Sequence, residues 1–468
     1  MRASLHLLPL LALGACTVGP NYVRPNVPLT PAFATAGVVT PAGDAAWWSA
    51  YNDPLLDSIV ARALAQNLDI AAAAARVDQA RAAANAAGAA LLPSASLGAS
   101  AEKQSQSLDT PFGAASNKLG FPRDYALYQV GAQASWEVDL FGGLRRGREA
   151  ARADFAGMRD QADAVRLGIA AETVDAYLQL RGLQARLAVA QQQLDTERQL
   201  VSLVRQRVDQ GVSPDRDLNR TLGEQQGLEA ALAPLRAAIA GQMNRLDILM
   251  GMQAGTSRAE LTPVAAIPLA PDPAGDVEPA ALMRRRPDIA AAERRLAASN
   301  ARIGVAVAEY YPHVSLAGLF GIASVGTGGL FTGNAVQAGG SAGLRWRLFD
   351  FGRVDAEVAQ AHGRNAEALA QYRGSVLQAT EEVETALSQL NEGRTEIAAR
   401  QQQVAALAKA RDQARQAYQG GVVALVDVLD ADRALLDASD RLAAARAGTA
   451  RASVAAVRAL GGGWQERS

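Results

Sequence analysis

The residue with the most specific chemistry in this sequence is Cys16, the only cysteine of the chain. It follows Leu-Gly-Ala at 13–15, and the segment before it begins with Arg2 and is mostly apolar from Leu5 to Leu13. This order is typical of a secretory signal peptide, and small residues before a cysteine let a processing peptidase approach. We expect residues 1–15 to be removed and the thiol of Cys16 to carry a covalent lipid. An ordinary leader with a chance cysteine is the alternative.

A second pattern that could carry chemistry is the pair Asp427 and Asp430. Two carboxylates three residues apart share one face of a helix. Around a threefold axis that face would form two stacked rings of three carboxylates, which attract cations and resist anions. The other interpretation is that both residues lie near a helix N-terminus, where the macrodipole stabilises negative charge. The residues alone leave both interpretations open.

The remaining residues argue against catalysis, metal binding and nucleic-acid binding. A single cysteine excludes an internal disulfide and a cysteine metal cluster, and outside the leader only His313 and His362 remain, far apart in sequence. Gly-Thr-Gly-Gly at 326–329 lacks the phosphate-loop pattern and is expected to form a hairpin loop at the cell surface. The balance of Lys+Arg 46 against Asp+Glu 47 excludes a strongly basic nucleic-acid binder. We therefore predict no enzyme, no metal, and no cofactor besides the covalent lipid on Cys16.

The elements that would position these residues occur twice. Asn-Leu-Asp-Ile at 67–70 and Arg-Pro-Asp-Ile at 286–289 each begin a helical run that ends in a proline and an alternating segment. Further along, Trp136 is repeated 210 residues later as Trp346. This indicates the duplication of a large unit, not a short solenoid repeat. Each copy is predicted to have the order helix, two strands, very long helix, turn and helix.

The very long helices follow from the absence of proline. None occurs between Pro122 and Pro214 or after Pro312, and a helix over residues 144–210 would reach roughly 100 Å. Part of this segment carries an apolar stripe with a spacing of three and four, typical of coiled-coil packing. Only Glu197 interrupts the stripe.

The turn after each long helix is marked by glycine, at Gly211 in the first copy and at 420–421 in the second. A glycine commonly ends a helix because it adopts the left-handed conformation. After the first turn, Ser213 is expected as the N-cap and Pro214 as a residue of the first helical turn. Each copy is thus predicted to form a helical hairpin with a tight tip.

Four segments alternate between apolar and polar residues, as a membrane-spanning strand of about 9–11 residues does. The fourth is expected to place Ala342, Leu344, Trp346 and Leu348 on its apolar face. Four strands cannot close a barrel, and an open edge in lipid leaves backbone groups unpaired at several kcal/mol each. Copies must then associate, and a conduit favours three copies because two would give a barrel filled by side chains. An amphipathic sheet on a soluble core is the alternative.

Several ordered motifs give the chain a resemblance to a known family. They are Cys-Thr-Val-Gly-Pro-Asn-Tyr-Val-Arg-Pro at 16–25, Trp-Trp at 47–48, Asp-Pro-Leu at 53–55, Arg-Arg-Pro-Asp-Ile at 285–289, and Ala-Arg-Ile-Gly at 301–304. Over nearly its whole length the chain resembles the NodT branch of the TolC-like outer-membrane factors. The resemblance implies an α+β membrane protein, in which a trimeric twelve-stranded β-barrel with four strands per chain continues into a twelve-helix periplasmic α-barrel.

The resemblance also implies a function. It is that of the outer-membrane channel of a tripartite efflux system, a passive conduit that exports small toxic molecules. The implied partners are two further copies in a homotrimer, a periplasmic adaptor, an inner-membrane pump of the RND class and outer-membrane lipid. Thr17, rather than an aspartate, follows the cysteine, which agrees with an outer-membrane lipoprotein extending into the periplasm. The alternatives are a channel for type I protein secretion and a periplasmic coiled-coil scaffold.

The resemblance assigns roles to particular residues. Asp427 and Asp430 match a pore constriction, and Asp217 and Tyr418 match a latch between the two hairpins. Val423 stands where the family has a basic residue, so a weaker latch is expected. Adaptor docking is expected at the tips, at Gly211, Val212, Ser213, Gly421 and Val422.

The chain is accordingly expected to divide into six parts. A signal peptide is followed by a lipid-anchored segment with part of an equatorial region, a first repeat, a connector in the equatorial region, a second repeat and a tail. Their expected bounds are 1–15, 16–60, 61–250, 251–285, 286–460 and 461–468.

Overall fold

The computed structural model describes residues 17–35, 46–268, 279–280 and 285–462. The predicted signal peptide and the lipid-bearing Cys16 lie outside the described residues, so both stay predictions. Contacts divide the chain into two compact units, and each is described by itself. Unit 1 holds the described residues of Met1–Pro25, Asp78–Gly157 and Ala292–Gln371, and unit 2 holds those of Asn26–Val77, Met158–Ala291 and Tyr372–Ser468.

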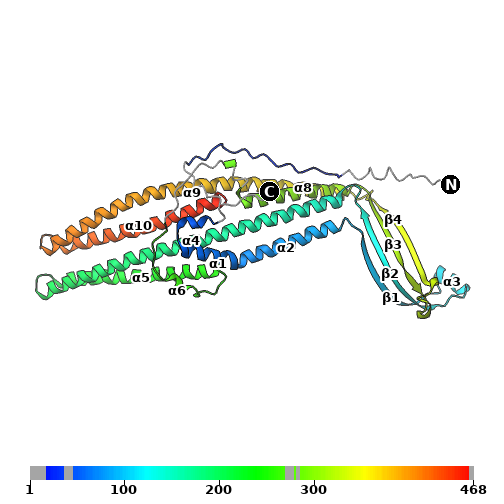
Figure 1. Cartoon of the computed structure of the whole chain (residues 1–468), viewed down its shortest axis with the longest axis horizontal. Helices are drawn as coiled ribbons and strands as arrows, with labels where there is room; N and C mark the ends of the chain where they lie inside the picture. Colours follow the sequence, from blue (N-terminus) through cyan, green and yellow to red (C-terminus); the bar gives the residue numbers. More distant parts are fainter. Residues whose placement is uncertain (1–16, 36–45, 269–278, 281–284, 463–468) are drawn as a thin grey trace. The chain divides into compact units, whose positions relative to one another are not determined.

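Three helices of the first half of the chain each have a counterpart of equal length in the second half (Figure 1). Helices α2 (Leu68–Ala89) and α8 (Pro287–Ala308) both have 22 residues. Helices α4 (Gly143–Asp209) and α9 (Arg353–Gln419) both have 67 residues, and α5 (Asp215–Leu249) and α10 (Leu425–Ala459) both have 35. The predicted order of elements is therefore present twice. Among the described residues, no helix is both long enough and apolar enough to cross a membrane.

Several short elements lie outside the predicted plan. They are η2 (Trp47–Tyr51), α1 (Pro54–Gln66), α3 (Pro111–Lys118), α6 (Arg258–Leu261), η3 (Thr327–Gly329) and η4 (Gly333–Ala335). Helix α1 has 13 residues and buries Leu56, Ile59, Val60 and Ala63 at a helical spacing that the prediction did not use. The other elements are too short for a helical period to stand out. The glycine-rich segment at 326–329 lies in the connection between two paired strands, as expected for a hairpin loop.

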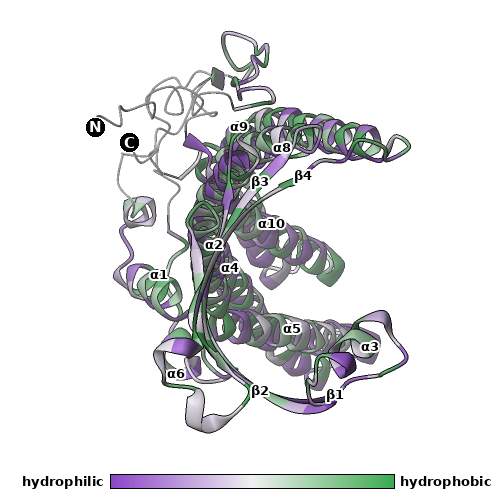
Figure 2. Ribbon diagram, turned by 90° about the vertical axis from the view of Figure 1, so that its right-hand side faces the viewer, coloured by the Kyte–Doolittle hydropathy of each residue, from purple (hydrophilic) through white to green (hydrophobic). Residues whose placement is uncertain are grey.

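Unit 1 is built on a four-stranded antiparallel sheet in the order β1-β2-β3-β4. The strands are β1 (Ser94–Ser105), β2 (Asp124–Val138), β3 (His313–Ser324) and β4 (Val336–Arg345). The sheet is strongly curved, with β1 and β4 at its two ends (Figure 2). The four alternating segments of the sequence are thus four strands of one sheet.

The fourth strand ends earlier than predicted. β4 ends at Arg345, so Trp346 and Leu348 lie beyond it. The indole Nε1 of Trp346 donates to the backbone oxygen of Tyr310 at 2.9 Å, and this bond holds the tryptophan at the end of the strand. Asp350 then accepts from the backbone nitrogen of Val354 at 2.9 Å and caps α9. The alternation of apolar and polar residues continues in the sequence beyond Arg345, where the strand has already ended and the chain turns toward α9.

An extended N-terminal segment, residues 17–25, is held on unit 1 by Arg146. This arginine is buried, and its guanidinium donates to the backbone oxygens of Val18 and Gly19 at 3.0 and 3.2 Å. Gly19 has a φ of 87°, and a Cβ on it would lie 2.4 Å from the Cα of Gly304. Only glycine fits at this crossing. Two of the motifs that carried the resemblance, at 16–25 and 301–304, therefore meet in the fold.

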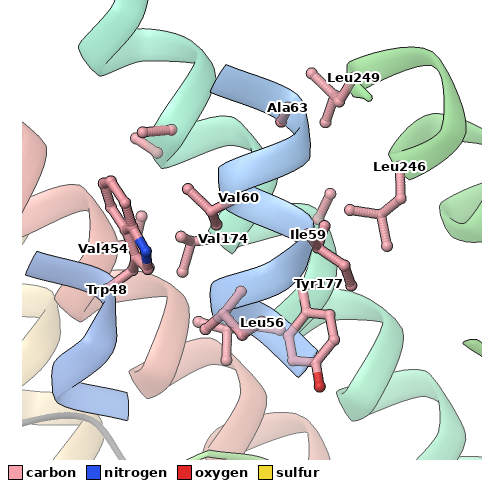
Figure 3. Packing of buried hydrophobic residues seen from close by; sticks show 14 of the residues in the cluster. Trp48, Leu56, Ile59, Val60, Ala63, Val174, Tyr177, Leu246, Leu249 and Val454 are labelled. Carbon is pink, nitrogen blue, oxygen red and sulfur yellow. The ribbon is translucent and has the colours of Figure 1, made fainter. Parts of the chain in front are cut away.

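The core of unit 2 forms where α1 packs between α4, α5 and α10 (Figure 3). The Asp53 carboxylate accepts from the backbone nitrogens of Leu55 and Leu56 at 3.0 and 3.3 Å, so it caps α1. The hydroxyl of Tyr177 on α4 donates to the same carboxylate at 2.5 Å. The same core holds the fully buried Ile59 and Val60, each contributing about 1.5–3 kcal/mol by burial.

Candidate functional site

The candidate site lies at the tips of two helical hairpins in unit 2. In the first, Gly211 has a φ of 73°, and the backbone nitrogen of Val212 donates to the oxygen of Arg207 at 2.8 Å. This six-to-one bond is that of a Schellman motif, which ends a helix with a left-handed residue. The second tip repeats the geometry at Gly421 and Val422. Both tips lie at the same end of unit 2 (Figure 1). The first hairpin is formed by α4 and α5, and its tip turn is 210–214. The second hairpin is formed by α9 and α10, and its tip turn is 420–424.

The helix after the first tip turn begins one residue later than predicted. Pro214 occupies the N-cap position of α5, and no side chain caps that helix. Ser213, predicted as the N-cap, lies before it and is half-buried. Proline is tolerated at this position because the backbone N–H that it lacks has no partner within the helix.

Each tip turn presents one large, exposed apolar side chain to its surroundings. Val212 is 62% exposed and Val422 is 80% exposed, at equivalent positions of the two turns. An exposed branched side chain gains no free energy from burial in the single chain, and it would gain about 1.5–3 kcal/mol if a partner buried it fully. Two such side chains are therefore suited to contact a partner protein.

Tyr418, one half of the predicted latch, is buried beside the first hairpin. Its ring lies 4.6 Å from the guanidinium carbon of Arg207, and Arg207 donates to the backbone oxygen of Tyr418 at 3.0 Å. The tyrosine hydroxyl has no hydrogen-bond partner among the described residues. Asp217 is not joined to it; its carboxylate lies 3.6 Å from Arg216. The structure thus places Arg207, not Asp217, against Tyr418, and the latch stays a prediction.

Arg207 was not singled out by the sequence, although a signal was present. It is the basic residue in the last turn of α4, where a cation is favoured by the helix dipole. The sequence could have flagged it as a C-terminal cation. It could not show that the partner lies on α9, because Tyr418 is 211 residues away.

Asp427 and Asp430 lie exposed in the first two turns of α10, three residues apart on one face. The carboxylate of Asp427 accepts from the backbone nitrogen of Ala424 at 3.0 Å, at the start of the helix. Asp427 therefore contributes a hydrogen bond at the N-terminus of α10, and the choice between the macrodipole and the carboxylate ring stays a prediction. Asp430 has no such bond among the described contacts, and its side chain is available to face an axis. Capping and a ring of carboxylates are compatible, since one oxygen of Asp427 is enough for the cap.

Glu197, which interrupts the apolar stripe, is buried beside a second carboxylate that the sequence did not indicate. Glu197 on α4 and Asp432 on α10 are each only 2% exposed. From α9, Arg411 lies 3.6 Å from the Asp432 carboxylate, and Arg415 donates to the backbone oxygen of Thr196 at 3.2 Å. Burial, with a smaller contribution from Asp432, raises the pKa of Glu197 to about 7. Burial also raises the pKa of Asp432.

Replacing Glu197 with glutamine is expected to remove a pH-dependent part of the stability of unit 2. Because the folded pKa of Glu197 lies above its usual value near 4.5, the folded state favours the protonated form. The stabilisation by that proton is complete below pH 4.5 and is lost as the pH rises through about 7. Glu197→Gln mimics the protonated form and should be more stable than the parent by about 1–3 kcal/mol at pH 8, with the gain vanishing toward pH 4.5.

The measurement is the thermal midpoint of the helical circular dichroism signal across this pH range. Glu229 on α5 is an exposed glutamate paired with Arg198 at 2.8 Å, so Glu229→Gln is the matched control and should show no such gain. An equal gain for Glu197→Gln at pH 5 and pH 8 would contradict the assignment.

Ion pairs fasten α10 to the first hairpin along its length. Arg186 on α4 pairs with Asp440 at 2.7 and 2.9 Å, and Arg451 pairs with Asp175 on α4 at 2.7 and 3.1 Å. A further pair joins Arg433 of α10 to α5. These contacts hold the two hairpins side by side. No group of three or more potential metal ligands occurs in the part of the chain that the structure describes.

Comparison with known proteins gives a consistent result over nearly the whole chain. The family described as outer membrane efflux protein matches residues 59–252 and 279–462. The chain is 32% identical to the pyoverdine export outer membrane protein OpmQ of Pseudomonas putida, covering 99% of this chain and 98% of that protein. It is 31% identical to nodulation protein T of Rhizobium leguminosarum bv. trifolii, covering 93% and 92%.

Solved structures show the same fold. The outer-membrane channel OprN superposes with a TM-score of 0.88 at 31% identity, covering 96% of this chain and 100% of that chain. The open state of the Neisseria gonorrhoeae MtrE outer membrane channel superposes with a TM-score of 0.83 at 26% identity, covering 96% and 99%.

Proposed function

This chain belongs to the outer membrane efflux protein family, and from that premise we propose that three copies form a passive conduit for small toxic molecules delivered by a periplasmic adaptor and an inner-membrane pump. The predicted fold class, with four antiparallel strands and long helices in a TolC-like arrangement, is confirmed. So are the resemblance to the NodT branch and the prediction of an outer-membrane efflux channel that is not an enzyme. A periplasmic scaffold is excluded by the same matches.

The open edges of the sheet carry the proposal of a trimer. No further strand of the described chain pairs with the outer edges of β1 and β4. An unpaired edge in lipid costs several kcal/mol for each backbone group. Association of copies satisfies both edges at once, and three copies would contribute twelve strands, an even number in the range of outer-membrane barrels.

The cargo is proposed only as a broad class. Relatives are named for exporting unlike substances, for example a pyoverdine export protein, a cation efflux protein and a toluene efflux protein. A conduit without a fitted binding site agrees with that diversity. The adaptor is proposed to dock at the tip turns, where Val212 and Val422 are exposed, and an RND-class pump is proposed as the energy source.

The test is the behaviour of the full-length protein purified from membranes. We expect a trimer by native mass spectrometry, which converts to monomer on heating in detergent, and conductance in planar lipid bilayers. Heated, monomeric protein is the control and should give no conductance. Deleting the gene should lower resistance to toxic compounds, and the wild-type gene should restore it. A water-soluble monomer without conductance would overturn the proposal.

A further inference from the structure

A buried pair of carboxylates lies between the two hairpins, near their tips. Glu197 is on α4 of the first hairpin and Asp432 is on α10 of the second, and each is only 2% exposed. Gln193, one turn before Glu197, donates to the backbone oxygen of Asp432 at 3.5 Å, so this face of α4 lies directly against α10. The pair therefore occupies the contact between the hairpins rather than the interior of one of them.

The rest of the fold leaves the oxygens of this pair without partners. Oε1 of Glu197 and both carboxylate oxygens of Asp432 have no hydrogen-bond partner among the described residues. A buried carboxylate without such a partner is strongly unfavourable in its charged form. A proton relieves this cost, because it neutralises one carboxylate and makes it a donor to the other. The unpartnered oxygens thus indicate a site that binds a proton.

The arginines of α9 do not replace that proton. Arg411 lies 3.6 Å from Oδ1 of Asp432, beyond hydrogen-bonding distance, and it also pairs with Asp412 of its own helix at 2.8 Å. Arg415 donates to the backbone oxygen of Thr196 at 3.2 Å rather than to a carboxylate. Both guanidinium groups therefore lie near the pair without satisfying its oxygens.

The nearby charged groups of the other helices are paired with one another. Arg433, next to Asp432 on α10, pairs with Glu224 of α5. Arg198, next to Glu197 on α4, pairs with Glu229 of α5 at 2.8 Å. Burial outweighs the attraction of the arginines, so the pKa values of both buried acids are raised.

The equivalent positions in the other half of the chain carry leucine. At the common offset of 210 residues, Glu197 corresponds to Leu407 on α9, and Asp432 corresponds to Leu222 on α5. Leucine packs well between helices, and buried charged groups can often be replaced by apolar residues without loss of stability. Helix packing alone therefore does not explain two acids at this contact.

We propose that Glu197 and Asp432 bind one proton between them and that this shared proton holds the two hairpins together. With the proton bound, the carboxyl group of one residue donates to the carboxylate of the other across the contact between α4 and α10. When the proton passes to the surrounding water, two like charges remain at a buried site, and the helices separate to admit water. The proposal rests on the channel of the proposed function and adds a control of its opening by pH.

The helix that carries Asp432 also carries the residues proposed to line the pore. Asp430 lies two residues before Asp432 on α10, and Asp427 lies five residues before it. Because the backbone of a helix is rigid over one or two turns, a displacement of α10 at Asp432 also displaces both of these residues. Separation of the hairpins would therefore widen the proposed constriction.

The direction of the pH effect follows from which state binds the proton more tightly. In the joined state the pKa of Glu197 is about 7, against an ordinary value of 4.5 for a glutamate in water. The stabilisation of the joined state by the proton is therefore complete below pH 4.5 and is lost as the pH rises through about 7. The channel should conduct more current at alkaline than at acidic pH.

The experiment is single-channel recording of the full-length protein in planar bilayers between about pH 5.5 and about pH 8. In the parent, conductance should rise over this range with a midpoint near pH 7. Glu197→Gln with Asp432→Asn has no proton to lose, so it should stay at the low conductance of the joined state. Glu197→Leu with Asp432→Leu, which copies the other half of the chain, should do the same. Glu229→Gln, at an exposed glutamate of α5, is the matched control and should follow the parent.

A second measurement reports the separation of the hairpins directly. Spin labels on Val212→Cys and Val422→Cys, one in each tip turn, give the distance between the tips by electron paramagnetic resonance, with labelled copies diluted among unlabelled ones. In the parent this distance should lengthen as the pH rises through about 7. In the background of Glu197→Gln with Asp432→Asn it should stay short at every pH.

The outcomes separate this inference from the proposed function. A rise in conductance or a lengthening between the tips that persists in Glu197→Gln with Asp432→Asn would overturn the shared proton and leave the channel standing. A constant tip distance in the parent would do the same. Absence of conductance at every pH would overturn the proposed function, while the tip distance would still decide whether the proton joins the hairpins.

Discussion

The double variant Asp427→Ala with Asp430→Ala is expected to conduct more current per channel than the parent and to lose its block by divalent cations. In three copies the exposed face of α10 that carries both residues would form two stacked rings of three carboxylates. Removing both rings takes away the negative charge that concentrates divalent cations at the constriction. We expect the affinity of the block to fall at least about tenfold, which corresponds to 1.4 kcal/mol.

The measurement is single-channel recording in planar bilayers, with and without a divalent cation. Because Asp427 also accepts from the backbone nitrogen of Ala424, alanine removes a helix cap as well as a charge. Asp427→Asn with Asp430→Asn keeps an acceptor at both positions and removes only the charge. If the asparagine variant conducts and is blocked as the parent is, the carboxylate rings are not the constriction, whatever the alanine variant does.

The periodicity of apolar residues and the positions of proline and glycine were enough to predict the main elements of the fold. The absence of proline over residues 144–210 predicted a helix that the structure begins at Gly143 and ends at Asp209. Glycines at the tips predicted turns because glycine, which has no Cβ, readily adopts the left-handed conformation that ends a helix. The end of β4 could not be predicted, because the alternation runs on through Trp346 and Leu348 while an aspartate cap starts the next helix.

The part of the candidate site that the sequence could not predict consists of contacts between residues far apart in the chain. Glu197 stood out because it interrupts an apolar stripe, but its neighbour Asp432 lies on α10, 235 residues away. Arg207 and Tyr418 are separated in the same way. Nothing in a local pattern reports such a pair, since each residue by itself fits a helix. The positions of Gly211 and Gly421, which need only local geometry, were predicted correctly.

Val212→Asp combined with Val422→Asp is expected to reduce resistance to that of a strain lacking the gene, while the trimer still forms. Both valines are exposed in the single chain, at 62% and 80%, so aspartate fits either turn without disturbing a buried contact. In a docked complex each aspartate would be taken out of water without a partner, at a cost of a few kcal/mol. Two such groups should weaken adaptor binding more than about a hundredfold.

The measurements are the inhibitory concentration of a toxic compound, co-purification of the adaptor after crosslinking, and native mass spectrometry of the trimer. Val212→Thr with Val422→Thr is the matched control, because threonine keeps the shape of valine and adds no charge, and it should retain most of the resistance. Each single aspartate variant then shows whether both hairpins contribute, as their equal tip geometry indicates. Full resistance in the double aspartate variant would place adaptor docking elsewhere on the helices. Loss of the trimer would instead show that these turns serve folding, because a partner surface at the tips has no reason to affect how three copies join.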